Sequence, residues 1–317
     1  MNFHKIFPSV SLFTIFLSVA IFAKPTPQIF TFESDSSGFN TKNYFYDNGE
    51  EVVAFDTQFT EKYANESIAF LKTKTKSPIK YLVITHPNPD KFNAISSFKK
   101  LGAKVVASRQ TTESLPGVYN YKKYYWTKIA KAFTEKNYPR LGKVDQTFEK
   151  EFSLRLKNGD VVKLTEFGTK GVSSNQTVAF IENLNSWIVG DLIHFKAHAW
   201  LEGGIINGKP SPDLKEWIKT LDSLKNIGNS DSQVFAGRGL EGKLNEVVKE
   251  QIKYLKIADE IVTDYISDLG NKKSELTSDK ASFHYSEIQK IFVKRFPEYQ
   301  LDYMIGYGVY GLVNSKL

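Results

Sequence analysis

Apolar segments with strand character alternate with helical patterns along the first third of the chain. Apolar residues recur at helical spacing over 59–72 and 90–100. Strands are expected before, between and after these helices, at 29–32, 43–46, 51–55, 81–85 and 105–107. Asp47-Asn48-Gly49 is a typical hairpin turn between two of them. Strands that alternate with helices in this way indicate a layered α/β fold.

The second half of the chain continues with strands and then changes to helices. Further strands are expected at 152–156, 161–165, 177–182, 187–189 and 233–235. Ser211-Pro212-Asp213 predicts a helix start, with a capping serine, a proline in the first turn and an acid near the positive end of the helix dipole. A long helix is expected over 244–269, and the last forty residues are also expected to be helical. A helical insertion over 118–136 carries tyrosines and a tryptophan that either line a hydrophobic channel or cover apolar surface.

The N-terminal residues have the pattern of a targeting signal. Lys5 precedes an apolar run over 6–22, and Ala23 is a suitable cleavage residue, so residues 1–23 are expected to be a secretory signal peptide. A retained membrane anchor is the alternative, because the run is near the short limit for a span. The expected location is the periplasm or outside the cell, with no membrane span after signal cleavage.

Charge and cysteine content exclude several classes of function. The chain has no cysteine among its 317 residues, which excludes disulfides and thiolate metal sites. Its formal net charge of +7 is dispersed over lysine-rich helix faces such as the one at Lys122 and Lys123. An anionic envelope partner stays open. No basic and aromatic motif typical of nucleic-acid binding is present, so nucleic acid is not an expected partner.

Five short segments, taken in order, resemble the metallo-β-lactamase superfamily. They are Asp56 at a strand end, His86-Pro87-Asn88-Pro89-Asp90-Lys91, Gly171-Val172-Ser173-Ser174-Asn175, Val189-Gly190-Asp191-Leu192 and Phe235-Ala236-Gly237-Arg238-Gly239. The resemblance implies an αββα sandwich over residues 28–240, followed by a helical C-terminal extension, 241–317, that packs on it.

The resemblance also implies a metal site, which this chain keeps only in part. The superfamily holds two metal ions with five histidines and two aspartates, and His86, Asp90 and Asp191 stand at three of those positions. The other four carry Asn88, Lys91, Val172 and Arg238. Fewer than three imidazoles are left for a tight zinc site. We therefore expect at most one weakly bound zinc, on His86, Asp90 and Asp191 with help from Asn88 or His198.

The remaining histidines and the two new cations have alternative interpretations. His194 and His198 are spaced to share a metal if they lie on one helix, and otherwise they are packing or rim residues. His284 is expected to be a surface or packing residue. Lys91 and Arg238 are expected to neutralise Asp90 and Asp191 in place of the second metal. The alternatives are that both cations point to solvent, or that an unusual metal site survives.

Two functions follow from the resemblance and its gaps. In the first, the protein is a hydrolase of weak or lost activity, in which metal-bound hydroxide attacks an ester, amide or lactone carbonyl. Asp90 would then orient the water, and His86 would hold the metal. In the second, the protein is non-catalytic and metal-free, and binds a small molecule or a partner in the same pocket.

Overall fold

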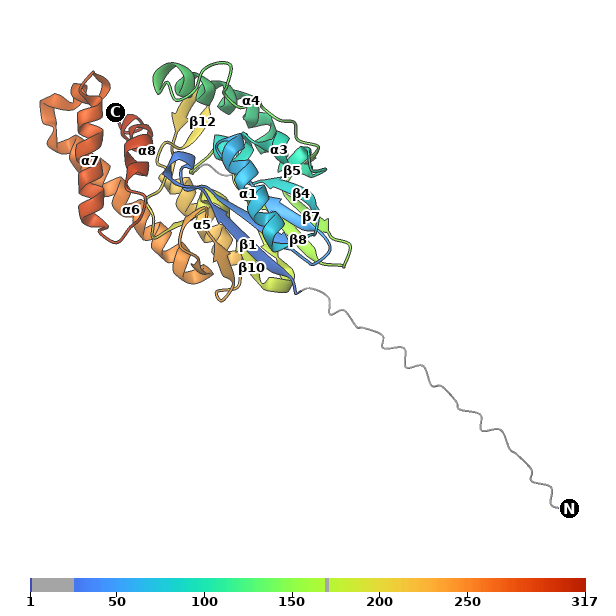
Figure 1. The fold of residues 1–317 in the computed structure, drawn as a ribbon. Helices are drawn as coiled ribbons and strands as arrows, with labels where there is room; N and C mark the ends of the chain where they lie inside the picture. Colours follow the sequence, from blue (N-terminus) through green and yellow to red (C-terminus); the bar gives the residue numbers. More distant parts are fainter. Residues whose placement is uncertain (2–25, 169–170) are drawn as a thin grey trace.

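The structure is a computed structural model that describes residue 1 and residues 26–168 and 171–317 (Figure 1). Apart from Met1, the expected signal segment 1–23 lies outside the described residues, and its cleavage stays a prediction. Within the described ranges, no helix has both the length and the apolar character needed to cross a bilayer.

The first half of the chain builds a six-stranded sheet in sequence order. Its strands are β1 (Gln28–Glu33), β2 (Lys42–Asp47), β3 (Val52–Phe55), β4 (Ile79–Ile84), β5 (Lys104–Ser108) and β6 (Gln146–Phe148). The expected hairpin at Asp47-Asn48-Gly49 is present, since Asp47 pairs with Val52. From β3 onward the neighbours are parallel, because helices connect them. Those helices include α1 (Glu61–Lys74), α3 (Ile95–Lys99) and α4 (Arg109–Tyr124), whose apolar residues form a core with one face of the sheet.

A second six-stranded sheet packs against the first. In spatial order it contains β16 (Gly242–Lys243), β14 (Gln233–Phe235), β10 (Ser186–Ile188), β9 (Thr177–Ile181), β8 (Val161–Glu166) and β7 (Glu151–Arg155). Fully buried residues of both sheets, such as Phe55, Val83 and Ile181, form the core between them. Two short ribbons lie outside the main sheets: β11 (His194–Phe195) with β15 (Arg238–Gly239), and β12 (Gly204–Ile206) with β13 (Lys209–Ser211).

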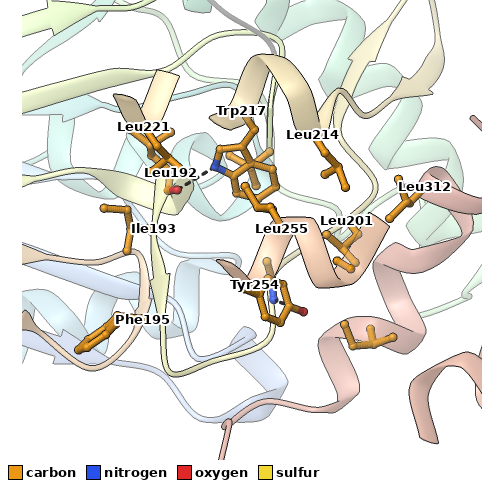
Figure 2. Packing of buried hydrophobic residues seen from close by; sticks show 14 of the residues in the cluster. Leu192, Ile193, Phe195, Leu201, Leu214, Trp217, Leu221, Tyr254, Leu255 and Leu312 are labelled. Carbon is orange, nitrogen blue, oxygen red and sulfur yellow. Dashed lines mark hydrogen bonds between the residues drawn. The ribbon is translucent and has the colours of Figure 1, made fainter. Parts of the chain in front are cut away.

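Helices from the last third of the chain form the outer layer on the side of the second sheet, some directly on its strands and some on the helices that cover it. They are α5 (Leu214–Ile227), α6 (Leu244–Asp268), α7 (Ala281–Arg295) and α8 (Tyr303–Asn314). In Figure 1 the orange to red helices gather on the side away from α1, and α4 reaches α8 through the Tyr121 hydroxyl, which lies 3.1 Å from that of Tyr310. Trp217 of α5 is fully buried, and its Nε1 donates to the Leu192 carbonyl at 2.9 Å (Figure 2). The layers therefore run helix, sheet, sheet, helix, which confirms the expected αββα sandwich; the domain boundary at 240 stays a prediction.

Three local expectations were wrong, each because a side chain supplies a cap or a break. The helix expected from 118 begins at Arg109, since the Ser108 hydroxyl accepts from the Thr111 amide and caps it. The helix expected over 90–100 splits into α2 (Pro89–Phe92) and α3, and the Ala94 amide at the break donates to the Thr57 hydroxyl. Asp213, not Ser211, caps α5, because Ser211 pairs with Gly204 in a ribbon.

Candidate functional site

Five charged residues from four parts of the chain meet at one edge of the sandwich. Asp56 follows β3, Asp90 and Lys91 belong to α2 just after β4, Asp191 follows β10, and Arg238 lies in β15. All five are buried. We call Asp56, Asp90, Lys91, Asp191 and Arg238 the charged cluster. The segments that carry the resemblance thus supply every residue of one site.

Lys91 occupies the centre of the charged cluster. Its side chain is 0 % exposed. Its Nζ lies 2.8 Å from Asp191 Oδ1, 3.0 Å from Asp90 Oδ2 and 3.9 Å from Asp56 Oδ2. A single ammonium is therefore within ion-pair distance of three carboxylates. A buried charge is tolerated only when it is paired in this way.

Arg238 closes the charged cluster from the other side. Its two terminal nitrogens donate to Asp90 Oδ2 at 2.7 Å and to Asp191 Oδ1 at 2.5 Å. Its Nε donates to the Phe39 carbonyl at 2.9 Å, and one terminal nitrogen also reaches the Thr41 hydroxyl at 3.2 Å. The guanidinium therefore bridges two carboxylates and ties them to the turn between β1 and β2.

The three carboxyl groups respond differently to burial. Burial raises the pKa of Asp90, but the charges of Lys91 and Arg238 outweigh it and bring the pKa down to about 2. The pKa of Asp191 lies well below its ordinary value, because Arg238 and Lys91 again outweigh burial. For Asp56 burial prevails over Lys91 and raises the pKa to about 7. Two ionised carboxylates thus face two cations.

His86 lies behind the charged cluster with a fixed tautomer. The Thr85 hydroxyl donates to Asp56 Oδ2 at 2.9 Å and lies 3.0 Å from His86 Nδ1. Because that hydroxyl proton is already used, we assign the His86 proton to Nδ1. Its Nε2 is buried, has no hydrogen-bond partner among the described residues, and lies 3.8 Å from Asp191 Oδ2. Burial lowers the pKa of His86 to about 4, so the ring is neutral near pH 7.

His194 and His198 lie in different surroundings. His194 lies in a short strand and not on a helix with His198; its Nε2 is 3.8 Å from Asp191 Oδ1 and its Nδ1 faces the His198 carbonyl at 3.2 Å. The His198 ring packs among Phe296 and Tyr299, with its Nδ1 3.2 Å from the Tyr254 hydroxyl. His198 therefore belongs to the contact with the C-terminal helices. His284 is buried on α7, beside Tyr265 and Glu275.

The donor set does not fit the zinc that the fold family implies. Across residues 26–168 and 171–317, no group of three or more histidine, aspartate or glutamate side chains is arranged to hold a metal ion. The position that a cation would take between Asp90 and Asp191 is filled by Lys91 Nζ. Asp191 is within ion-pair distance of both Lys91 and Arg238. A metal would have to displace these internal cations before it could bind.

A small pocket opens above the charged cluster. Its walls are largely aromatic, with Pro89 and the polar residues Asn88, Asp90, Lys122, Asp191 and Arg238 completing it; the rings belong to Phe39, Phe59, Trp126 and Trp200. The free volume is about 30 Å³, which is room for one or two water molecules but far below the ~300–1,000 Å³ of ordinary ligand sites. The rings, and not solvent, fill this site.

Several residues of this region were missed by the sequence analysis. Lys122 was placed on an exposed lysine face, yet it is 4 % exposed and forms an ion pair with Glu202. Glu202 also accepts from Trp200 Nε1 at 2.8 Å and from the Tyr310 hydroxyl. Phe39 carried no signal, because nothing in its local sequence indicates a contact with Arg238, 199 residues away. The expected insertion divides its aromatic residues, since Trp126 lines the pocket whereas Tyr124 is 60 % exposed.

The fold is similar to those of solved metallo-β-lactamases. A metallo-β-lactamase from Pontibacter korlensis matches with a TM-score of 0.54 and 18% identity, covering 73% of this chain and 99% of that one. The DIM-1 metallo-β-lactamase, in a structure exposed to ceftazidime, matches with a TM-score of 0.52 and 14% identity, covering 74% of this chain and 99% of that one. No family model and no curated protein matches the sequence. The chain therefore has the metallo-β-lactamase fold, as the five segments predicted.

Proposed function

We propose that this protein is a metal-independent, non-catalytic binding protein that takes a small molecule in the pocket above the charged cluster. The observation that carries the proposal is the position of Lys91 Nζ, within 3.9 Å of three carboxylates. An ammonium that balances these charges supplies no open coordination position and activates no water. The fold is kept, and the chemistry that the fold family performs with zinc is lost.

The residues around the pocket support binding more than hydrolysis. The described lining contains no serine, threonine or cysteine that would act as a nucleophile. Asp90 is held ionised by two cations, and His86 is not part of the lining. A hydrolase of this fold would need metal-bound hydroxide, but Asp90 and Asp191 are paired with Lys91 and Arg238, which leaves the single imidazole of His86 as an unpaired donor. Aromatic walls with a few polar groups are typical of a ligand site.

Thermal unfolding with zinc and with a chelator tests the proposal. The parent should melt at the same temperature in both, because no site gains a ligand. A bound metal at one hundred times its Kd would instead add about 2.7 kcal/mol to stability. The double variant Lys91→His/Arg238→His returns imidazoles to two ligand positions and should become zinc-stabilised. Lys62→His, at a side chain 70% exposed, controls for surface binding.

Two outcomes would contradict the proposal. The first is zinc stabilisation of the parent as large as that of the double variant. The second is hydrolysis of a chromogenic β-lactam or of p-nitrophenyl acetate by the parent above the uncatalysed rate, abolished by Asp90→Asn. The first result would show that the parent binds zinc, and the second would show that it is a hydrolase.

We also propose that the protein acts outside the cytoplasm, in the periplasm or the medium. The support is the sequence of residues 1–23, with Lys5, an apolar run and Ala23. Intact-mass analysis of protein from the cell envelope fraction should give a chain that begins at Lys24. A full-length chain that begins at Met1 and is recovered from the cytoplasm would contradict this.

A further inference from the structure

Phe39 lies at the centre of the aromatic residues that fill the pocket. Its ring centroid is 4.9 Å from that of Phe59, 5.4 Å from Trp126 and 5.5 Å from Tyr307, and the Phe59 and Tyr307 contacts are edge-to-face. Trp200 makes a further edge-to-face contact at 5.9 Å. Edge-to-face contacts at these separations are the favoured geometry of aromatic pairs. Four rings thus surround a fifth, which comes from the turn between β1 and β2.

The backbone of Phe39 makes a polar contact with the charged cluster. Its carbonyl accepts from Arg238 Nε at 2.9 Å. Phe39 thus places its ring among aromatic side chains and its carbonyl oxygen against the Arg238 guanidinium. The aromatic ring and the carbonyl oxygen of Phe39 are therefore the two groups of the chain itself that occupy the pocket.

The turn that presents Phe39 has an unfavourable backbone. Phe39 and Asn40 have φ values of 62° and 47°, in the left-handed region that a side chain with a Cβ rarely adopts. The turn is anchored at its ends, where Asp35 accepts from the Ser37 amide and the Ser34 hydroxyl donates to the Gly38 carbonyl. The Phe39 amide donates to the Ser36 carbonyl at 3.1 Å and the Asn40 amide donates to the Asp35 carbonyl at 3.0 Å, so backbone bonds of the turn and the ring contacts together hold this conformation.

Building on the proposed function, we propose that Phe39 is an internal ligand and that the external ligand is a small, neutral aromatic compound bearing a carbonyl oxygen, which displaces the Phe39 ring. Phe39 occupies the pocket and leaves about 30 Å³ of free volume beside it, so the pocket is narrow although its walls suit a ligand. A neutral ligand is favoured because the floor pairs Asp90 and Asp191 with Lys91 and Arg238, and Lys122 is paired with Glu202.

Benzamide, a phenyl ring with a carbonyl, is the probe that tests this. Phe39→Ala removes the competing ring and should bind benzamide at least tenfold more tightly than the parent in isothermal titration calorimetry. Fluorescence of Trp126 and Trp200, which line the pocket, should change on binding. Cyclohexanecarboxamide keeps the carbonyl but lacks the aromatic ring, and should bind more weakly. Phe283→Ala, at an exposed site on α7, should bind benzamide as the parent does.

The outcomes separate this inference from the proposed function. Equal benzamide affinity of the parent and Phe39→Ala would overturn the internal ligand, and equal affinity for the two carboxamides would overturn the aromatic class. If Phe39→Ala does not fold, Phe39→Leu, with a smaller side chain, should show a smaller gain in the same direction, and no gain would overturn the inference. Zinc stabilisation of the parent overturns the proposed function alone, since the benzamide comparison involves no metal.

Discussion

The charges of two buried lysines of this protein are neutralised in different surroundings. Lys91 lies in the charged cluster, among three carboxylates and beside Arg238. Lys122 lies where α4 meets the C-terminal helices and pairs with Glu202, which also accepts from Trp200 Nε1 and the Tyr310 hydroxyl. We call Lys122, His198, Trp200, Glu202 and Tyr310 the C-terminal junction. In the charged cluster, cations neutralise carboxylates. In the C-terminal junction, a single ion pair is surrounded by neutral hydrogen-bond donors and aromatic rings.

The difference teaches how much depends on one side chain in each site. In the charged cluster Arg238 is the other cation that pairs with Asp90 and Asp191, so the loss of Lys91 leaves two carboxylates to share it. In the C-terminal junction Glu202 keeps two neutral donors if Lys122 is removed. Balanced charges therefore tolerate substitution less well than a pair that is surrounded by neutral hydrogen-bond donors.

The largest expected effect is that of Lys91→Ala. Removing one partner of a buried ion pair costs about 3–5 kcal/mol, because the other charge stays buried and unpaired. The free energy of unfolding from urea titration should fall by that amount. Lys62→Ala, in an exposed pair with Glu66, should change it by no more than about 0.5 kcal/mol. If the two variants unfold alike, Lys91 is not neutralising the carboxylates.

Lys122→Ala should lower stability less, by about 1–3 kcal/mol, because Glu202 retains the Trp200 and Tyr310 hydrogen bonds. The same urea titration measures it. A loss as large as that of Lys91→Ala would show that neutral donors do not compensate, and would remove the distinction between the two sites.

A glycine lies against the Asp191 side chain and another lies against the Glu202 backbone, which allows a comparison of the two sites. A Cβ on Gly237 would lie 2.3 Å from Asp191 Oδ1, and a Cβ on Gly311 would lie 2.5 Å from the Glu202 carbonyl oxygen. Gly237→Ala and Gly311→Ala should each cost about 1–3 kcal/mol through overpacking. Gly117→Ala, in α4 with nothing within 4 Å, should be neutral or stabilising. Because the same Cβ would lie 2.5 Å from the Gly190 carbonyl oxygen, parent-like melting of Gly237→Ala would mean that both Asp191 and the Gly190 backbone can shift.

The smallest expected effect is on pH dependence. Burial lowers the pKa of His198 from 6.5 to about 4. The unfolded chain then binds a proton below pH 6.5 that the folded chain does not bind until about pH 4. Stability from this residue is complete above pH 6.5 and falls as pH decreases, by about 1.4 kcal/mol at pH 5.5. His198→Gln should flatten the curve of melting temperature between pH 6.5 and 4, and an unchanged slope would contradict this.

The charged cluster and the adjoining His86 should together contribute less to that slope, because His86 and Asp56 act in opposite directions. His86, with a pKa lowered to about 4, loses stability as pH falls, as His198 does. Asp56, with a pKa raised to about 7, contributes stability that is complete below its ordinary value of 3.8 and is lost as pH rises through 7. Asp56→Asn removes the opposing group and should make the fall of the melting temperature between pH 6.5 and 4 steeper than in the parent, and an unchanged slope would show that Asp56 does not offset His86.

The sequence predicts the sandwich and the charged cluster better than it predicts the pocket. Strand and helix patterns are local, and the residues of the cluster lie in or shortly after strands, so motif order places them at one edge. The first turns of α4 were missed because Pro116 and Gly117 disfavour a helix, whereas a Ser108 cap and contacts with the sheet outweigh them. Tertiary packing therefore outweighs the low helix propensity of these two residues.

The pocket could not be predicted because its contacts join distant segments without a local pattern. Lys122 meets Glu202 across 80 residues and Tyr310 meets Glu202 across 108. A lysine between charged and aromatic residues has the same local sequence whether it is buried or exposed. Only the packing of α4 against the C-terminal helices decides between these states.

The contacts of Arg238 also bear on the order in which the protein assembles. They join it to Asp191, Asp90 and Phe39 across 47, 148 and 199 residues, and Lys91 meets Asp191 across 100. Closing loops of this length costs chain entropy before any contact forms, so such pairings slow folding. Among the five residues of the charged cluster, Arg238 stands last in the chain, 148 residues after Asp90. The charge balance of the cluster can therefore be completed only after residue 238 has been synthesised.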